Sequence, residues 1–293
     1  MDLSQTLEFV TKSDVGKVRA SNEDAVYANP VCGLAILADG MGGYNAGEVA
    51  SGMATTLLGH RLEAAFAGLG ERRSGGDRRL TQSALEAEIA HANGAVYSAA
   101  QSQPQYAGMG TTLVMALFHG DSLTVAHIGD SRLYRLRGRE LQLLTRDHSL
   151  LQEQLDSGLL SLEQAHHAEN RNLVTRALGV DPSVEAEIKD IDTRAGDVYL
   201  LCSDGLNDMI DDEEIGAILY RRSSDLEQAA AQLVQRANDS GGRDNVSLIL
   251  VRIGRSAPAA RGWLASLFAR FKQSALEGGG RWRNWYSAWM AWC

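Results

Sequence analysis

The stretch Leu34-Ala35-Ile36-Leu37-Ala38-Asp39-Gly40-Met41-Gly42-Gly43 joins a run of apolar residues to a carboxylate and a glycine-rich turn. Five consecutive apolar residues that end in a turn predict a buried strand over 34–38. The carboxylate of Asp39 would then lie at the end of that strand. Glycines beside it let the backbone come close to a ligand, because they lack a β-carbon. This combination is typical of a site for a divalent cation with oxygen ligands.

Polar turns of the same kind occur at four other places in the chain. Each carries carboxylates and borders an apolar, strand-like run, and they occupy residues 22–24, 129–132, 203–208 and 243–245. More than 200 residues separate the first turn from the last. The pattern therefore predicts a metal site that the fold assembles from distant segments.

The charge of the chain is unevenly distributed. Its 293 residues can bury one substantial core with an appendage, and the net charge is −9. That charge argues against a general nucleic-acid binder, which needs a basic face for the phosphate backbone. Residues 1–254 carry 22 basic and 36 acidic side chains, whereas residues 255–293 carry six and one. We expect a domain over 1–254, a linker over 255–262 and a basic, tryptophan-rich tail over 263–293.

The three cysteines, Cys32, Cys202 and Cys293, show no paired spacing. The first two lie in apolar runs, where a small buried hydrophobic side chain is the simpler interpretation. No disulfide framework is indicated, so a reducing cytoplasm fits best. Neither a signal peptide nor an apolar stretch long enough to span a membrane is recognisable in the sequence.

Hydrophobic periodicity predicts an α+β fold. Consecutive strands joined by tight turns over 112–144 suggest an antiparallel meander, and pairs of amphipathic helices are expected before and after it. The elements combine into two stacked antiparallel β-sheets flanked by helix pairs, an α/β/β/α sandwich. The expected strands are 7–10, 24–27, 34–38, 112–118, 122–128, 133–136, 141–144, 184–191, 198–202 and 246–251, and the expected helices cover 46–62, 85–96, 150–155, the segment after 211 and 226–237.

Taken in order, the motifs resemble the metal-dependent protein phosphatases of the 2C type, and especially their bacterial branch. The resemblance extends over about residues 6–253. The motifs that carry it are Arg19-x-x-x-Glu23-Asp24, Asp39-Gly40-Met41-Gly42-Gly43, Gly110-Thr111-Thr112, Gly129-Asp130-Ser131-Arg132, Ser203-Asp204-Gly205-Leu206 and Asp244-Asn245.

The resemblance implies a centre of two Mn²⁺ or Mg²⁺ ions. Asp39 would bridge the two ions. The Gly40 carbonyl and, through water, Glu23 would complete the coordination of one ion. Asp204 and Asp244 would hold the other ion. Anionic ligands of this kind offset the repulsion between two cations, which together can deprotonate a bridging water near neutral pH.

Further residues receive roles from the same resemblance. Arg19 would bind the substrate phosphate, for which a planar guanidinium is well suited. Asp130 and Asp208 would hold a third, weaker ion. Two structural alternatives stay open here, because Asp130 can cap its own turn and Asp208 can cap the helix after it. Asp24 and Asn245 would support the ligands from outside, with Asp24 near a metal-bound water.

The chain departs from many animal members of the family directly after the Asp-Gly pair. Those members often have a histidine there, proposed as the general acid, whereas this chain has Met41, which cannot donate a proton. His148 is the candidate substitute, although its Asp-His-Ser context also suits the start of a helix. We expect His166 and His167 to be surface residues of a polar segment.

The resulting hypothesis is a bacterial serine/threonine protein phosphatase in cytoplasmic signalling, acting on proteins phosphorylated by a serine/threonine kinase. Two alternatives are a catalytically weak scaffold that binds phosphoproteins, a pseudophosphatase, and a phosphatase for a small phosphate ester. The scaffold is disfavoured because every implied metal ligand is present in the sequence.

All five tryptophans of the chain lie in its tail, where they form apolar stripes among basic residues. Such a segment favours a membrane surface or a partner protein, which would place the enzyme at the inner face of the membrane. Packing of the stripes against the domain is the alternative. Cys293 could be lipidated or free.

Overall fold

The computed structural model describes residues 6–43, 46–67, 78–161, 164 and 173–254. The chain divides after Gly254 into two units. The expected linker and tail lie outside the described residues.

Two antiparallel sheets form the centre of the described domain. One has the order β2-β3-β5-β6-β9, with β4 paired to the end of β3; the other has the order β1-β11-β10-β7-β8. The strands of the first sheet are β2 (Asp24–Asn29), β3 (Leu34–Met41), β4 (Gly110–Thr111), β5 (Leu113–His119), β6 (Ser122–Ile128) and β9 (Glu187–Asp192). Those of the second are β1 (Leu7–Asp14), β7 (Arg132–Arg137), β8 (Glu140–Leu143), β10 (Val198–Cys202) and β11 (Val246–Ile253).

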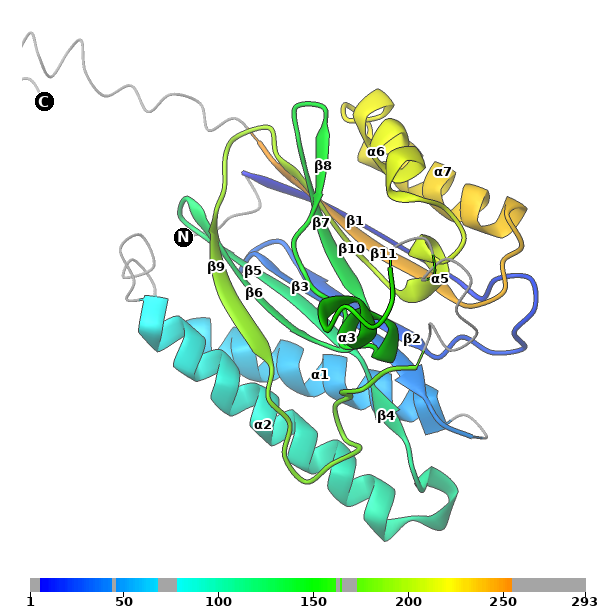
Figure 1. The fold of residues 1–293 in the computed structure, drawn as a ribbon. Coiled ribbons are helices and arrows are strands. Elements are labelled where there is room, and N and C mark those ends of the chain that lie inside the picture. Colours follow the sequence, from blue (N-terminus) through cyan, green and yellow to red (C-terminus); the bar gives the residue numbers. More distant parts are fainter. Residues whose placement is uncertain (1–5, 44–45, 68–77, 162–163, 165–172, 255–293) are drawn as a thin grey trace, which may run out of the picture. The chain divides into compact units, whose positions relative to one another are not determined.

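Helices cover the outer face of each sheet, as Figure 1 shows. The long helices α1 (Ala46–Ala67) and α2 (Arg78–Ser102) pack on the first sheet, and α6 (Asp212–Arg221) and α7 (Leu226–Asp239) pack on the second. A third apolar core, which includes Leu37, Val125 and Ile249, fills the space between the sheets. The predicted α/β/β/α sandwich is confirmed.

The expected meander over 112–144 is wrong in one respect. β5 and β6 pair with each other, but β7 pairs with β10 and β8 in the other sheet. The chain therefore crosses between the sheets at Gly129–Asp130–Ser131 rather than turning back within one sheet. Strand periodicity shows which residues are buried, and both sheets are buried on their inner faces, so the pattern could not show the crossing.

Several element boundaries also differ from the expected ones. β3 continues beyond Asp39 to Met41, because β4 pairs with its last two residues. The short helices α3 (Leu150–Asp156) and α5 (Asp204–Asn207) lie beside the strand ends, and α5 was not predicted. The N-cap of α6 is Asp211, whose side chain accepts a hydrogen bond from the Glu214 amide.

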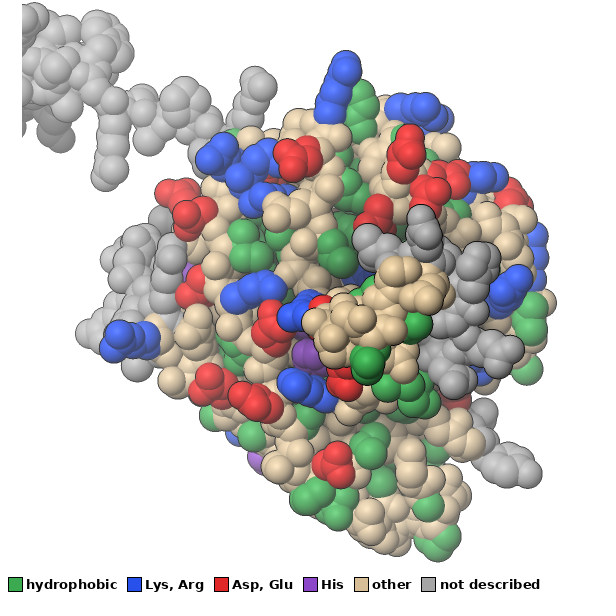
Figure 2. Space-filling view, in the orientation of Figure 1, with side chains coloured by type: hydrophobic (Ala, Val, Ile, Leu, Met, Phe, Trp, Pro, Cys, Tyr) green, Lys and Arg blue, Asp and Glu red, His purple; other side chains and the backbone are tan. Residues whose placement is uncertain are grey.

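Acidic and basic side chains are interspersed over the face of the domain drawn in Figure 2. Among the described residues, no helix combines the length and the apolar composition that a membrane crossing requires.

Candidate metal centre

The acidic turns predicted from the sequence lie at one end of the two sheets. Asp39 is near the end of β3, and Asp24 begins β2 directly opposite it in the antiparallel register. Asp204 begins α5, immediately after β10, and Asp244 immediately precedes β11, which pairs with β10. Asp130 occupies the crossing from β6 to β7. Strands from both sheets therefore bring these carboxylates together.

Threonines fix the backbone that carries Asp39. The amide of Asp39 donates to Oγ1 of Thr112 at 3.0 Å, and the amide of Thr112 donates back to the Asp39 carbonyl at 2.9 Å. The hydroxyl of Thr111 donates to the same carbonyl at 2.8 Å. The side chain of Asp39 is thus presented from a backbone with little freedom to move.

Asn245 connects the first acidic turn to β11. Its Oδ1 accepts a hydrogen bond of 2.8 Å from the Glu23 amide, and its Nδ2 donates to the carbonyls of Val15 and Ser21. The Glu23 carbonyl in turn accepts from the Gly40 amide at 3.1 Å. Asn245 thereby holds the backbone of Glu23 in place.

Gly40 and Gly205 allow close approaches of backbone to backbone. A β-carbon on Gly40 would lie 2.1 Å from the Gly47 carbonyl oxygen, and one on Gly205 would lie 2.0 Å from the Asn245 carbonyl oxygen. No side chain fits at either position without moving main-chain atoms. Glycine is therefore required where β3 meets α1 and where α5 meets β11.

Asp24 is held by the second sheet rather than by its own. Its Oδ2 accepts a hydrogen bond of 2.8 Å from Oγ of Ser203, and Ser203 Oγ also accepts from the Ser247 amide. The other carboxylate oxygen, Oδ1, is buried without a hydrogen-bond partner among the described residues. One oxygen of Asp24 is thus fixed, and the other is free for a ligand.

The carboxylates raise one another's pKa values. Burial, and then the charges of Asp24, Asp204 and Asp130, raise the pKa of Asp39 well above its ordinary value. Burial, and then the charges of Asp130 and Asp208, do the same to the pKa of Asp204. Burial also raises the pKa of Asp24 and of Asp130 to about 6. Such a cluster is stable only when it takes up protons or cations.

The donor set fits divalent cations. The buried oxygens Asp24 Oδ1 and Asp204 Oδ1 have no hydrogen-bond donor in the described part of the chain. Carboxylate and carbonyl oxygens are the ligands that Mg²⁺ and Mn²⁺ prefer. Cations bound between these groups would coordinate the unpartnered oxygens and offset the repulsion between the carboxylates.

The two structural alternatives for Asp130 and Asp208 have different outcomes. The carboxylate of Asp130 does bond its own backbone, which partly lowers its pKa. Asp208 does not cap the acidic helix, since Asp211 is the N-cap of α6. The Asp208 charge instead raises the pKa of Asp130 and of Asp204, so its carboxylate lies near both.

Arg19 lies at the rim of the cluster and is half exposed. Its Nη2 donates to Oδ2 of Asp244 at 2.7 Å. This hydrogen bond, opposed by partial burial, raises the pKa of the guanidinium. The expected phosphate-binding side chain is therefore already beside the carboxylates, where it pairs with one of the expected metal ligands.

A family profile for protein phosphatase 2C matches residues 17–250 of the chain. The chain belongs to the protein phosphatase 2C family. It is 40% identical over 247 residues to the serine/threonine protein phosphatase PstP of Mycobacterium tuberculosis, an alignment that covers 84% of this chain and 45% of PstP. It thus spans less than half the length of that relative. It is also 37% identical to the serine/threonine phosphatase stp of Listeria welshimeri, over 82% of this chain and 93% of that protein.

A solved structure supports the same family assignment. The catalytic domain of PstP in complex with two manganese ions superposes with a TM-score of 0.73 at 39% identity, covering 85% of this chain and 99% of that domain. The prediction of a protein phosphatase 2C from the bacterial branch is confirmed.

Two side chains considered as general acid in this protein phosphatase 2C cannot protonate a leaving group at neutral pH. Met41 ends β3 and carries no acidic proton. Burial, and then the neighbouring His127, lower the pKa of His148 to about 4, so its imidazole is neutral at pH 7. The helix-start interpretation of this segment holds, because Ser149 is the N-cap of α3. His166 and His167 lie outside the described residues.

Sequence reasoning missed the residues that hold the acidic side chains of this protein phosphatase 2C in place. Thr112 bonds Asp39 from 73 positions away, and Ser203 bonds Asp24 from 179 positions away. Both lie inside recognised motifs, which is the only signal that pointed to them. Ser51, whose hydroxyl donates to the Glu23 carbonyl at 2.6 Å, lies in an ordinary helical segment and gave no signal.

Proposed function

We propose that this chain is a serine/threonine protein phosphatase that hydrolyses phosphoserine and phosphothreonine with Mn²⁺ or Mg²⁺. The observation that carries the proposal is the buried cluster of mutually repelling carboxylates, two of whose oxygens have no hydrogen-bond partner among the residues that the structure describes. In this proposal two ions are held by Asp39, the Gly40 carbonyl, Glu23, Asp204 and Asp244, and a third by Asp130, Asp208 and Asp204.

Bound divalent cations supply a water of lowered pKa and neutralise charge on the phosphoryl oxygens. The chain itself supplies alignment. Asn245 and the Gly40 amide hold Glu23, and Thr112 holds the strand end that carries Asp39. These contacts reduce the reorganisation that the site needs during the reaction.

Arg19 is proposed to bind the substrate phosphate. Its guanidinium pairs with Asp244, so gripping a phosphate with the same nitrogen requires that ion pair to open. The exchange replaces one charge-assisted hydrogen bond by others of the same kind. Half of the side chain is exposed, which leaves it accessible to a substrate on a protein surface.

The scaffold alternative is not supported, because the relatives are named as phosphatases and the carboxylates of the site come together. The substrates of such an enzyme are phosphoproteins, and we propose that they are products of a serine/threonine kinase. Protein kinases use ATP, so the proposed location is the cytoplasm. The isolated positions of Cys32 and Cys202 in the sequence, with no paired spacing, agree with a reducing compartment.

The test is hydrolysis of a phosphothreonine peptide by purified protein with Mn²⁺, with Mg²⁺ and with EDTA, alongside Asp39→Asn. We expect turnover that depends on metal and falls about 10²–10³-fold in the variant, because one carboxylate between the cations is lost. A small ester, p-nitrophenyl phosphate, is assayed in parallel. Turnover of the ester alone would limit the activity to small substrates, and no turnover with either metal would refute the proposed reaction.

The domain boundaries lead to a second proposal, in which 1–254 is the phosphatase domain, 255–262 a linker and 263–293 a docking tail. The tail contrasts in charge with the domain and carries all five tryptophans. A basic, aromatic segment is attracted to anionic lipid, so we propose that it places the enzyme at the inner face of the membrane. A protein truncated after Arg255 should keep its activity and no longer sediment with phosphatidylglycerol vesicles. Equal sedimentation of the full and truncated chains would refute this role.

A further inference from the structure

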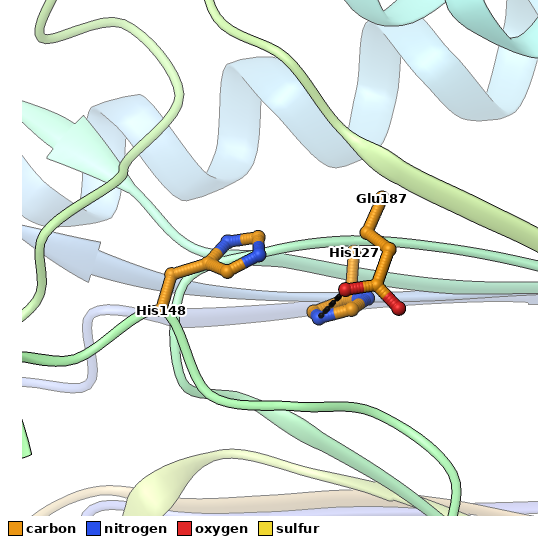
Figure 3. Close-up of side chains that lie close together, drawn as sticks. All are labelled: His127, His148 and Glu187. Carbon is orange, nitrogen blue, oxygen red and sulfur yellow. Dashed lines mark ion pairs between the residues drawn. The ribbon is translucent and has the colours of Figure 1, made fainter. Parts of the chain in front are cut away.

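Three side chains outside the acidic cluster lie close together, as Figure 3 shows. His127 on β6, His148 before α3 and Glu187 on β9 place one nitrogen or oxygen atom each within 4.8 Å of the others. Imidazole and carboxylate are common ligands of transition metals. The hydrogen bonds of the two histidines, however, indicate a different role.

Two of the imidazole nitrogens are used in hydrogen bonds, whereas Nδ1 of His127 is buried with no hydrogen-bond partner in the described part of the chain. Nε2 of His127 lies 2.8 Å from the Arg146 carbonyl oxygen, so this nitrogen carries the proton. Nδ1 of His148 accepts a hydrogen bond of 3.2 Å from the Gly129 amide, so its lone pair is already used. The two rings are stacked, with centroids 4.8 Å apart and planes inclined by 19°, rather than converging on one point (Figure 3).

We propose that His148 is a positioning residue that holds the Gly129–Asp130 turn in the geometry that cation binding needs. This inference rests on the proposed function. Two hydrogen bonds join the residue to the turn. The Gly129 amide donates to Nδ1 of His148, and the His148 amide donates to the Gly129 carbonyl at 2.9 Å. Both polar groups of the Gly129 backbone are therefore satisfied by one residue.

The turn itself has little room to adjust. Gly129 has a φ of +97°, a left-handed conformation that favours glycine. A β-carbon there would lie 2.8 Å from the Thr112 side chain. An unsatisfied Gly129 amide at this buried crossing would be unfavourable, and rotating the peptide to reach water would displace the next residue.

The next residue is Asp130, which belongs to the acidic cluster. Its side chain is buried, and its charge raises the pKa of both Asp39 and Asp204. Ser131 follows it and shares a hydrogen bond of 2.7 Å with Thr112, which in turn holds the Asp39 backbone. A shift of the turn would therefore move a proposed ligand and loosen the support of another.

His148 is itself firmly held. Its carbonyl accepts a hydrogen bond of 2.8 Å from the Thr175 amide, and its ring stacks on the buried His127. The preceding residue, Asp147, accepts three hydrogen bonds from Arg132, at 2.7 to 3.1 Å. Burial keeps His148 neutral at pH 7, so Nδ1 remains an acceptor. The segment is thus rigid enough to position the turn.

Two variants separate the hydrogen bond from the packing of the ring. His148→Phe keeps an aromatic ring that can stack on His127 but removes the acceptor. His148→Asn loses the ring but carries an oxygen that can take the place of Nδ1. Mn²⁺ binding to the EDTA-treated full chain is measured by calorimetry, together with the Mn²⁺ concentration that gives half-maximal peptide hydrolysis. We expect the weakest Mn²⁺ binding step to weaken roughly 10- to 100-fold in His148→Phe, and to remain within about threefold of wild type in His148→Asn.

Asp130→Asn supplies the matched comparison, because it removes the proposed ligand that the turn carries. Adding His148→Phe to Asp130→Asn should weaken Mn²⁺ binding no further, since both changes act on one site. Wild-type binding in His148→Phe, a larger loss in His148→Asn than in His148→Phe, or additive losses in the double variant would each overturn the proposal. Wild-type protein that neither binds Mn²⁺ nor hydrolyses the peptide would refute the proposed function instead.

Discussion

Asp204→Asn is expected to make the metal-free protein more stable while it removes most of the metal-dependent activity. Asp130, Asp208 and Asp244 repel a negative charge on Asp204, and its Oδ1 has no hydrogen-bond donor in the described chain. An amide of the same shape removes the repulsion and can donate to a neighbouring carboxylate. We expect the free energy of unfolding in EDTA to rise by about 1–3 kcal/mol. Hydrolysis of the phosphothreonine peptide should fall about 10²–10³-fold, and the stabilisation of the protein by Mn²⁺ should shrink.

The pH dependence of this gain identifies its cause. The pKa of Asp204 is raised in the folded protein, so folding favours the protonated form. The contribution of Asp204 to the stability of the wild type in EDTA is therefore fully present below its unfolded pKa and is lost as pH rises through its folded pKa. The advantage of Asp204→Asn should increase as pH rises above the ordinary pKa of an aspartate, as measured by thermal unfolding over a pH series. Asp211→Asn is the control, because Asp211 is an exposed N-cap and asparagine caps equally well. A gain independent of pH, or an equal gain in the control, would contradict the electrostatic explanation.

The sequence was sufficient to predict the layers of the fold and to indicate acidic turns that the fold brings together. Apolar runs such as 34–38 and 198–202 are long enough to identify buried strands, and Asp39 and Asp204 lie at or close to the ends of these two runs. A carboxylate at a strand end is visible in the sequence because hydrophobic periodicity stops there. The register that places Asp24 opposite Asp39 follows from the short connection between β2 and β3.

The contacts that support the site could not be predicted in the same way. The crossing at Gly129–Asp130 joins two sheets whose strands have the same pattern, so local periodicity contains no information about it. The acceptor that holds this crossing is the His148 side chain, 19 positions further along the chain. A hydrogen bond between such segments depends on the tertiary fold. The secondary-structure propensities of the residues therefore do not predict it.

The close approach of β3 to α1 could not be predicted either, although the glycines that allow it were recognised in the sequence. The turn after Asp39 suggested that backbone would come near a ligand. The structure shows that Gly40 approaches other backbone as well. A β-carbon on Gly40 would lie 2.1 Å from the Gly47 carbonyl oxygen and 2.6 Å from the Glu23 carbonyl oxygen. Gly47 is equally restricted, since its own β-carbon would lie 2.8 Å from the Gly40 carbonyl.

Gly40→Ala is therefore expected to destabilise the domain and to disturb the metal site together. The added methyl group would collide with two carbonyl oxygens of the main chain, so α1 or the turn before β2 must move. Overpacking of this kind costs about 3 kcal/mol, which corresponds to a fall in Tm of roughly 6–12 °C for a domain of this size. The hydrogen bond from the Gly40 amide to the Glu23 carbonyl would be lost or lengthened, and Mn²⁺ affinity should fall with it.

Gly52→Ala provides the matched control for this prediction. Gly52 lies inside α1, and a β-carbon there would meet no atom within 4 Å. Alanine in the interior of a helix is more favourable than glycine by about 0.5–1 kcal/mol, so this variant should be slightly more stable than wild type. Thermal unfolding in EDTA and calorimetric Mn²⁺ titration of both variants test the difference. If Gly40→Ala unfolds within about 2 °C of wild type and binds Mn²⁺ equally well, the contact between β3 and α1 is not the constraint on this strand end. A loss of stability with unchanged Mn²⁺ affinity would show instead that Gly40 supports the fold without aligning the carboxylates.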